Sequence, residues 1–397
     1  MTLEFRLSEN IARLKESATL AVAARCRAMR AAGQQVIDLG AGEPDFDTPA
    51  FIRQAAAEAV EKGATRYTAT EGILPLREAI AAAASRGLRH GAPVTPAEVV
   101  VSSGSKQSLY NACVCCFGPG DEVLVPTPAW TSYYEMLELA RATAVPVFGT
   151  EEHSLKVTVE QLEAAATPRT KGLMLCSPSN PTGAVYGSDE LTAILDLASS
   201  RGWWVIADEI YLRIAYGQPV RSALALATRR DNLIIINGVA KAYAMTGWRI
   251  GWSIAPVAVS GAMTAFQSHT TSNAAAVSQH AALAAIERHD EAEAAITHMV
   301  TEFGRRRDAV LDALAAFPSV RYVKPEGAFY LYVNVEGFEN AEDPGAAFAT
   351  RVLERESVAV VPGSAFLTPG WIRASYATSL DIAVDGVTRI ARCLTTS

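Results

Sequence analysis

The sequence of 397 residues predicts an α/β fold, with a large domain built on a seven-stranded, mainly parallel sheet and a smaller α+β domain after it. Two patterns support this prediction. Short apolar runs alternate with helical or loop segments from about residue 99 to residue 255, which is typical of a parallel sheet covered on both faces. A long helical segment then leads to further strand-like runs. We place an N-terminal arm joining the small domain at residues 1–48, the large domain at 49–290 and the C-terminal small domain at 291–397.

Composition excludes several classes of protein. Half of the residues are hydrophobic and 19% are charged, which is ordinary for a globular protein. The net charge of −7 provides no basic surface for nucleic acid. No apolar run approaches the roughly 18 residues of a membrane span, and the charged first 30 residues lack the apolar core of a signal peptide. We therefore expect a cytoplasmic protein that binds neither nucleic acid nor membrane.

The six cysteines are expected to be free thiols. Cys113 and Cys116 have the CxxC spacing of redox or metal motifs. They lie in a predicted helix with no second cysteine or histidine pair nearby, so we interpret them as small buried hydrophobic side chains. No metal site is predicted.

Prolines open the first two predicted helices of the large domain. One runs from Pro49 to about Lys62 and the other from Pro75 to Gly87, with proline near the first turn of each. The preceding loop, residues 40–49 (GAGEPDFDTP), contains two glycines and two prolines. It is either a plain connector between domains or a loop whose backbone approaches a ligand at Gly42, where no side chain obstructs.

Seven apolar runs are predicted to form the large sheet. The first, residues 99–103, leads into Gly104, Ser105 and a helix to about Phe117. A strand, a turn of small residues and a helix start together can bind phosphate, but many α/β turns look similar. The other six runs lie at residues 122–126, 144–148, 172–176, 203–207, 233–236 and 250–255.

Unusual polar clusters follow four of these runs. Ligands of such sheets bind beyond the carboxyl ends of the strands, so we predict that the clusters converge on one site. They lie at residues 126–133 (PTPAWTSY), 177–183 (SPSNPTG), 208–211 (DEIY) and 237–251 (NGVAKAYAMTGWRIG).

Lys241 is the most informative residue of these clusters. A lone lysine is usually solvated, but this one follows a core strand and is flanked by Ala240 and Ala242, which favours a closed pocket. Burial disfavours the ammonium form, and a neutral amine can form a Schiff base with an aldehyde. The aldehyde that we propose is pyridoxal phosphate (PLP). Arg249 could hold its phosphate, because a guanidinium binds phosphate bidentately.

Other polar residues suit the same cofactor. Asp208 ends a core strand, where it accepts bonds from loop amides or pairs with a buried cation such as a protonated pyridine nitrogen. Tyr211 and Asn180 could donate hydrogen bonds to the ring oxygen, and Trp130 could stack on the ring or simply pack in the core. Arg373, within a strand pattern, could bind an α-carboxylate.

In this interpretation Lys241 also serves as the acid–base group. The amino acid displaces the lysine from the aldehyde carbon of the cofactor. The freed amine is then well placed to take the Cα proton and to return it at the C4′ carbon of the cofactor. One base acting at both positions is the core of a 1,3-proton shift.

The C-terminal part is predicted to start with a long helix. Residues 275–315 are rich in alanine and glutamate and would bridge to the small domain. Three consecutive arginines, residues 305–307, are more typical of a solvated helix face than of a nucleic-acid site. Strand-like runs follow at residues 328–335, 358–361 and 371–376.

Taken together, the motifs resemble the class I aminotransferases of PLP fold type I. The sequence is most similar to bacterial aspartate aminotransferases of the subgroup that contains prephenate aminotransferases. The resemblance covers nearly the whole chain. It rests on residues 17–19 (SAT), 42–49 (GEPDFDTP), 177–183 (SPSNPTG), 208–211 (DEIY), 240–251 (AKAYAMTGWRIG), 361–366 (VPGSAF) and 372–377 (IRASYA).

The resemblance implies an enzyme that moves an amino group between aspartate or glutamate and a 2-oxo acid such as 2-oxoglutarate, with prephenate as a further candidate acceptor. It implies catalytic roles for Lys241, Asp208 and Tyr211. Lys241 would bind the cofactor covalently, and Asp208 would contact its pyridine nitrogen. Asn180 and Tyr211 would contact the ring oxygen, and Trp130 would stack on the ring face. The phosphate would be bound by Gly104, Ser105 and Arg249.

The resemblance also implies a substrate site and a homodimer. The α-carboxylate side would be lined by Gly42, Trp130, Asn180 and Arg373. For the distal carboxylate the subgroup nominates Lys106, assisted by Ser17 and Thr19, with Lys15 as a second candidate; Lys106 could instead belong to the phosphate turn or be exposed. Tyr67 matches a position that reaches the phosphate of the neighbouring subunit, and simple loop packing is its alternative.

One departure from the family pattern is Ala240, since many relatives have serine before the lysine. It removes one phosphate hydroxyl without affecting the lysine, and mildly favours the aspartate subgroup. An aromatic or alanine-type aminotransferase and a PLP-dependent β-lyase remain alternatives, because they share Lys241, Asp208 and Arg373. A ligand-sensing regulator with a DNA-binding domain is disfavoured by the acidic charge and the lack of a helix-turn-helix pattern.

Overall fold

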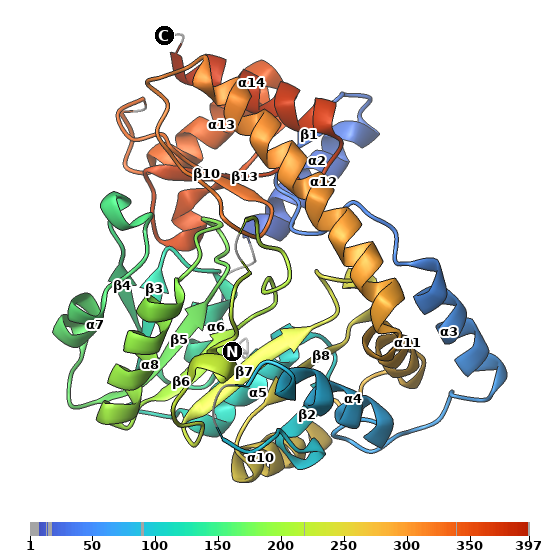
Figure 1. The fold of residues 1–397 in the computed structure, drawn as a ribbon. Helices are drawn as coiled ribbons and strands as arrows, with labels where there is room; N and C mark the ends of the chain where they lie inside the picture. The colour runs from blue at the N-terminus through green and yellow to red at the C-terminus, as the bar shows by residue number, and fades with distance from the viewer. Residues whose placement is uncertain are drawn as a thin grey trace, which may run out of the picture.

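A seven-stranded sheet forms the centre of the larger part of the molecule, in the lower half of the view in Figure 1. The computed structural model describes residues 8–12, 14, 18–88, 91–217, 219–338 and 340–395. The strand order is β2-β8-β7-β6-β5-β3-β4; β8 runs antiparallel to both neighbours and the other pairs are parallel. The seven predicted strands are thus confirmed. They are β2 (Val99–Ser102), β3 (Glu122–Thr127), β4 (Thr143–Phe148), β5 (Thr170–Cys176), β6 (Trp204–Asp208), β7 (Leu233–Gly238) and β8 (Gly251–Ile254).

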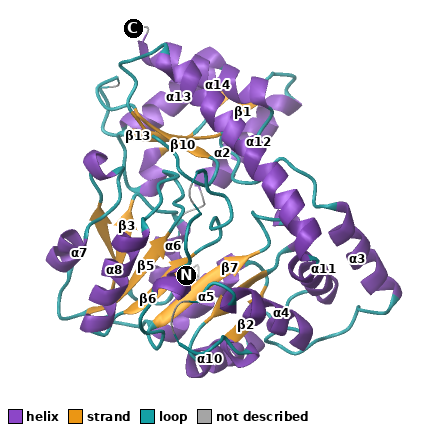
Figure 2. Cartoon of the chain, in the orientation of Figure 1, coloured by secondary structure: helices purple, strands orange, loops and turns teal. Residues whose placement is uncertain are grey.

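Alternate side chains of the strands pack into two cores on opposite faces of this sheet. In β7, Ile234 and Ile236 contact one core, and Leu233 and Ile235 contact the other. Successive strand residues point to opposite faces, so a run that is apolar throughout needs cover on both sides. Helices provide that cover (Figure 2). Helices α5, α6 and α10 lie on one face, and α4, α8 and α11 lie on the other.

The helices of this part begin close to the predicted positions. Pro49 precedes α3 as its N-cap, and Pro75 lies in the first turn of α4. Proline suits the first turn, where its missing N–H would have no partner in the helix. The helices are α3 (Ala50–Glu61), α4 (Leu74–Ser85), α5 (Ser105–Cys116), α6 (Ser132–Leu139), α7 (Val159–Ala165), α8 (Ser188–Arg201), α9 (Ala223–Leu226), α10 (Val257–Ser268) and α11 (Ala276–Glu287).

The predicted long helix is α12 (His289–Ala315), which spans 27 residues and leads to a second, smaller sheet (Figure 1). That sheet has the order β12-β13-β10-β9. Its strands are β9 (Tyr322–Val323), β10 (Tyr330–Asn334), β12 (Val361–Pro362) and β13 (Trp371–Ser375), and α13 (Pro344–Glu356) and α14 (Leu380–Thr395) pack near it. The smaller α+β part is therefore confirmed.

The N-terminal segment joins this second part. After α1 (Glu9–Ala12) and α2 (Ala18–Ala31), strand β1 (Ile37–Asp38) pairs in parallel with β11 (Val358–Ala359). The domain limits near residues 48 and 290 stay a prediction.

The composition led to two expectations, about membrane-spanning segments and about the cysteines, that can be compared with the described residues. No helix among them is long and apolar enough to cross a membrane. No disulfide joins the six cysteines, all of which lie in the described part of the chain. Cys113 is fully buried in α5, and burial raises the pKa of its thiol far above the usual range.

Candidate active site

The predicted polar clusters meet at the carboxyl edge of the large sheet. Asp208 is the last residue of β6, Asn180 follows β5, and Lys241 lies three residues beyond β7. Strands β5, β6 and β7 pair in parallel, so these three side chains start from the same edge. The sheet topology therefore creates the site, as expected for open α/β sheets.

Lys241 is partly buried at the middle of this edge. Its Nζ donates a hydrogen bond to the carbonyl oxygen of Gly42 and lies 5.8 Å from the ring centroids of Tyr211 and Phe329. Burial lowers the pKa of Lys241 to about 8, although the nearby Glu43 carboxylate opposes this shift. Roughly a tenth of the amine is therefore neutral at pH 7, far more than for an ordinary lysine, and the neutral form is the one that nucleophilic chemistry requires.

Asp208 is a buried carboxylate with two protein hydrogen bonds. Its side chain is 3% exposed. The Tyr133 hydroxyl donates to Oδ2 at 2.7 Å, and the Ile210 amide donates to Oδ1 at 3.1 Å. Burial raises the pKa of Asp208 to about 6, while both hydrogen bonds lower it. The group is thus mainly an anion at neutral pH.

Tyr133 was missed by the sequence analysis as a site residue. The signal was its place three residues after Trp130, in a polar cluster that follows a strand. In the structure it is 1% exposed and its ring meets that of Trp130 edge to face.

Arg373 is a buried cation without an acidic partner in the described part of the chain. It lies in β13, is 1% exposed, and donates to Asn180 Oδ1 and Gly40 O, each at 2.9 Å. Its guanidinium lies 4.4 Å from the ring centroid of Tyr330. Its Nε is buried and has no hydrogen-bond partner among the described residues. Because a buried charge needs a counter-charge, the site has the donor set for an anionic ligand.

The tyrosine hydroxyls of Tyr211 and Tyr330 lie 2.8 Å apart beside this arginine. Tyr330 belongs to β10 and was not predicted as a site residue. A Cβ added to Gly42 would lie 3.3 Å from the Tyr330 hydroxyl, so the loop of residues 40–49 approaches the site closely. Its backbone carbonyls meet both Lys241 and Arg373, which supports the ligand-loop interpretation over that of a plain connector.

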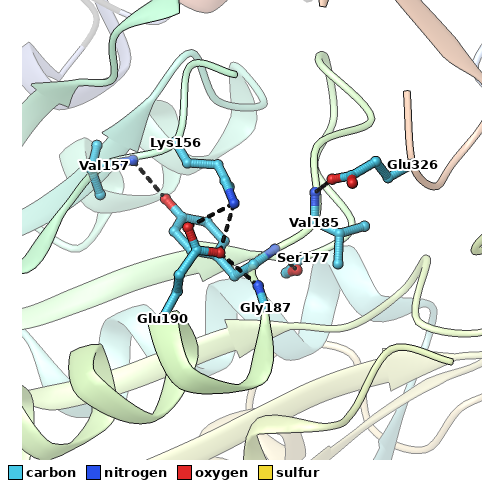
Figure 3. A network of polar contacts seen from close by, with 8 residues as sticks. Lys156, Val157, Ser177, Val185, Gly187, Glu190 and Glu326 are labelled. Carbon is cyan, nitrogen blue, oxygen red and sulfur yellow. Dashed lines mark hydrogen bonds and ion pairs between the residues drawn. The ribbon is translucent and has the colours of Figure 1, made fainter. Parts of the chain in front are cut away.

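A polar network holds the segment that carries Asn180 (Figure 3). The Tyr186 amide donates to Ser177 Oγ at 3.1 Å, and its hydroxyl accepts from the Val157 amide at 3.0 Å. Glu190, near the start of α8, accepts from Lys156 Nζ at 2.6 Å and from the amide of Gly187 at 2.7 Å. These bonds fix residues 177–187 at both ends, so that Asn180 is presented to Arg373 by a rigid loop.

The start of α5 forms a small basic recess with Arg249. Gly104 has φ +89, and a Cβ there would lie 3.0 Å from Cζ of Arg249 and closer still to its Nη2. A Cβ on Gly251 would overlap the Ser105 backbone nitrogen. The first amides of a helix have no partner within it, so they and the guanidinium can bind a phosphate together. The Ser105 hydroxyl donates to Asn237 O at 3.0 Å.

Lys106 and Trp130 lie together at the edge of the site. The exposed Lys106 side chain places its Nζ 4.6 Å from the Trp130 ring centroid. Desolvation of the lysine and the charge of Arg249 lower its pKa. Lys106 thus lies near the predicted ligand site, although it follows the phosphate turn directly.

The structure does not test the roles predicted for four further residues. Lys15 and Ser17 lie outside the described residues, and so does the side chain of Thr19 in α2. Tyr67 is 91% exposed. Its loop is nevertheless held in place, because Gln279 Nε2 donates to Thr68 Oγ1 at 3.0 Å.

Comparison with known proteins agrees with this geometry. The family described as aminotransferase class I and II matches residues 34–386. An aspartate aminotransferase of Streptomyces avermitilis is 44% identical to this chain, and the match covers 98% of this chain and 97% of the relative. An aspartate/prephenate aminotransferase of Cereibacter sphaeroides is 43% identical, and the match covers 97% of each chain.

A solved structure gives the same result. The structure of aspartate aminotransferase from Thermus thermophilus with maleate has a TM-score of 0.93 and 38% identity, and the match covers 98% of this chain and 100% of the other. The chain therefore belongs to the class I and II aminotransferase family, within the aspartate aminotransferase group of PLP-dependent enzymes.

Proposed function

We propose that this chain transfers the amino group of L-aspartate or L-glutamate to a 2-oxo acid such as 2-oxoglutarate, using PLP bound at Lys241. The observation that carries the proposal is the pairing of two groups. Arg373 is a buried cation whose Nε lacks a partner, and Lys241 beside it has a lowered pKa. A guanidinium such as that of Arg373 binds a carboxylate, and an amine such as that of Lys241 reacts with a carbonyl carbon.

The residues of the site fit the cofactor. Lys241 would hold it covalently, and Asp208 would keep a proton on its pyridine nitrogen. Asn180 accepts from Arg373 through Oδ1, which leaves its Nδ2 to donate to the ring oxygen together with the Tyr211 hydroxyl. The α5 start, with Gly104, Ser105 and Arg249, would hold the phosphate, and Trp130 would stack on the ring.

In the reaction, the protein positions the substrate and moves one proton. Bound PLP supplies an electron sink for the charge that develops at the substrate Cα. Arg373 binds the α-carboxylate and so fixes which Cα bond faces the ring. The amine of Lys241 would serve as the base that takes the proton from the substrate Cα. The hydrogen bond from Tyr133 orients the Asp208 carboxylate before the reaction, and such preorganisation reduces the reorganisation needed during the step.

For the distal carboxylate of the substrate we propose Lys106. Its Nζ lies 4.6 Å from the Trp130 ring centroid, and a dicarboxylate with its α-carboxylate on Arg373 needs a second cation. Prephenate is proposed as a further acceptor, on the basis of the 43% identical aspartate/prephenate relative. We also propose a homodimer in which Tyr67, exposed on its own subunit, reaches the phosphate site of the other.

The test is a half-reaction followed by absorbance. Purified protein loaded with PLP is expected to show a visible band, which aspartate or glutamate removes much faster than alanine or phenylalanine. The Lys241→Ala variant serves as control and should give no such band change. A loaded protein that ignores both acidic amino acids would exclude the proposed substrates, and a protein that cannot be loaded would exclude the cofactor.

A further inference from the structure

A large cavity lies behind the loop that carries Lys241. Its volume is about 910 Å³, within the usual range of small-molecule sites. It is bounded by α4, α9, α11 and the start of α12, and strands β7 and β8 form its floor. The floor is apolar, with Ile235 from β7 and Trp252 and Ile254 from β8. No residue proposed above to contact cofactor or substrate lines this cavity.

Two polar side chains face the cavity with unused hydrogen-bonding capacity. Glu209, which follows Asp208, is 5% exposed, and its Oε1 accepts from Ser222 Oγ at 2.9 Å and from the Ala223 amide at 2.6 Å. Its Oε2 has no hydrogen-bond partner among the described residues. The hydroxyl of Tyr243, two residues after Lys241, likewise has none there. A carboxylate oxygen without a protein donor can accept a hydrogen bond from a ligand.

Arginines surround the opening. Arg86, Arg213 and Arg221 all line the cavity. Arg213 pairs with Glu293 at 2.6 Å, whereas neither Arg86 nor Arg221 has an acidic partner in the described part of the chain. The opening therefore carries uncompensated positive charge above an apolar floor.

We propose that this cavity is a second ligand site, which binds a small organic acid with an aromatic body and an N–H donor. The carboxylate would meet Arg86 and Arg221, the ring would lie on Trp252, and the N–H would donate to Glu209. The site is separate from the catalytic one, because Lys241 Nζ points to Gly42 whereas Ala242 and Tyr243 line the cavity. This inference goes beyond the proposed function and does not depend on it.

The class of ligand follows from comparing candidate molecules with the apolar floor and with the charged side chains of the cavity. A fully apolar molecule would leave the arginines and Glu209 without partners, which is unfavourable once water is displaced. A small inorganic anion would satisfy the arginines but leave the apolar floor uncovered. A molecule with both an anionic end and a flat apolar body satisfies each wall.

The test uses indole-3-propionate, which has a ring, an N–H and a carboxylate but no amino group to transfer. Its binding to the PLP-loaded protein is measured by calorimetry. Ala84→Phe fills the cavity from α4, and Ala82→Phe places the same group on the exposed side of the same helix. We expect Ala84→Phe to weaken binding by at least about tenfold and Ala82→Phe to leave it unchanged.

A second pair of variants tests the charge. Arg86→Ala combined with Arg221→Ala should weaken binding of the same compound by a similar factor, whereas Arg53→Ala, an exposed arginine on α3, should not. Equal binding by Ala84→Phe and Ala82→Phe would place the compound elsewhere and overturn the proposal. The proposal is also overturned if the unmodified protein does not bind, or if Ala84→Phe separates subunits in sedimentation, because a second copy of the chain would then fill the cavity. Transamination of aspartate, assayed separately, reports on the proposed function alone.

Discussion

Single side chains in the site have distinct electrostatic tasks. Lys241 and Asp208 are both shifted toward their neutral forms by burial, to pKa values of about 8 and about 6. Arg373 remains charged and has no acidic partner among the described residues. The site thus holds one reactive amine, one tunable carboxylate and one fixed cation, and each can be tested by a single substitution.

The Lys241 pKa predicts how the apoprotein recovers PLP. Only the neutral amine attacks the aldehyde, so the rate of reconstitution should rise with pH and level off above about 8. An ordinary lysine would continue to gain rate to a pKa of about 10.4. Stopped-flow absorbance over pH 6–10 measures this, and a rate that still rises tenfold per pH unit between about pH 9 and 10 would contradict the burial of Lys241.

Tyr133→Phe is expected to raise the pKa of Asp208 further, because it removes a donor that stabilises the carboxylate. A hydrogen bond to a charged group contributes about 1.5–3 kcal/mol, so the acidic limb of kcat/KM should move up by at least about one pH unit. Tyr134→Phe is the matched control, since its hydroxyl bonds to Thr127 instead. The same profile for both variants would show that Tyr133 has only a packing role.

Lys106→Ala tests the distal-carboxylate site. Loss of a charge-assisted contact should raise KM for aspartate by about tenfold or more, with less than about a twofold change for phenylalanine. Lys171→Ala, an exposed lysine at the start of β5, controls for the change in net charge. Equal increases for both amino acids would remove Lys106 from substrate recognition.

At the scale of helices and loops, the start of α5 depends closely on its neighbours. Gly104 occupies a left-handed conformation, and any side chain there would meet Arg249. The helix start, the glycine and the guanidinium therefore form one unit. The role of this unit in phosphate binding can be separated from the backbone strain at Gly104. The comparison needs a second glycine that has a similar φ value but no such neighbour.

Gly104→Ala should weaken PLP binding by at least about tenfold, because the methyl group displaces Arg249 from the helix start. Gly120→Ala has the same left-handed strain, at φ +92, but its methyl group meets nothing within 4 Å. Both variants should lose roughly 1 kcal/mol of stability in urea unfolding. PLP dissociation constants from fluorescence quenching measure the difference, and equal affinities would disprove the role of this recess.

The outcome for individual residues shows what the sequence could predict. Lys241, Asp208 and Asn180 were predicted to converge because each follows a strand of one parallel sheet, and local sequence is enough to place them. Tyr133 and Tyr330 were not, since their approach depends on how α6 and β10 are oriented against segments far away in the chain. The cavity behind Lys241 was also beyond prediction, because its walls are helices that lie far apart in the sequence.

For the complete chain, the proposed dimer gives a specific expectation. The mass in sedimentation should be about twice 42.2 kDa. If Tyr67 reaches the other subunit, Tyr67→Phe and Lys241→Ala subunits should complement each other when mixed and reassociated. Each mixed dimer then has one site with Lys241 and a partner's intact tyrosine.

PLP titration of that mixture measures the complementation. The mixture should contain tight PLP-binding sites that neither parent variant has. Their number should be at most one for each mixed dimer. A mixture that binds PLP as the average of its parents would show that Tyr67 acts within its own subunit or not at all. Re-mixing each variant with itself is the control for losses during reassociation.

The short pairing of β1 with β11 has a consequence for how the protein is made. Ile37 pairs with Val358, so the partner of a segment near the N-terminus is synthesised some 320 residues later. At about 5–20 residues per second, a ribosome needs roughly 15–60 s to cover that distance. During this time the large sheet can already form, since its strands lie between residues 99 and 254. Strand β1, which leads into the loop that contacts Lys241, can therefore form its native pairing only after Val358 and Ala359 have been synthesised.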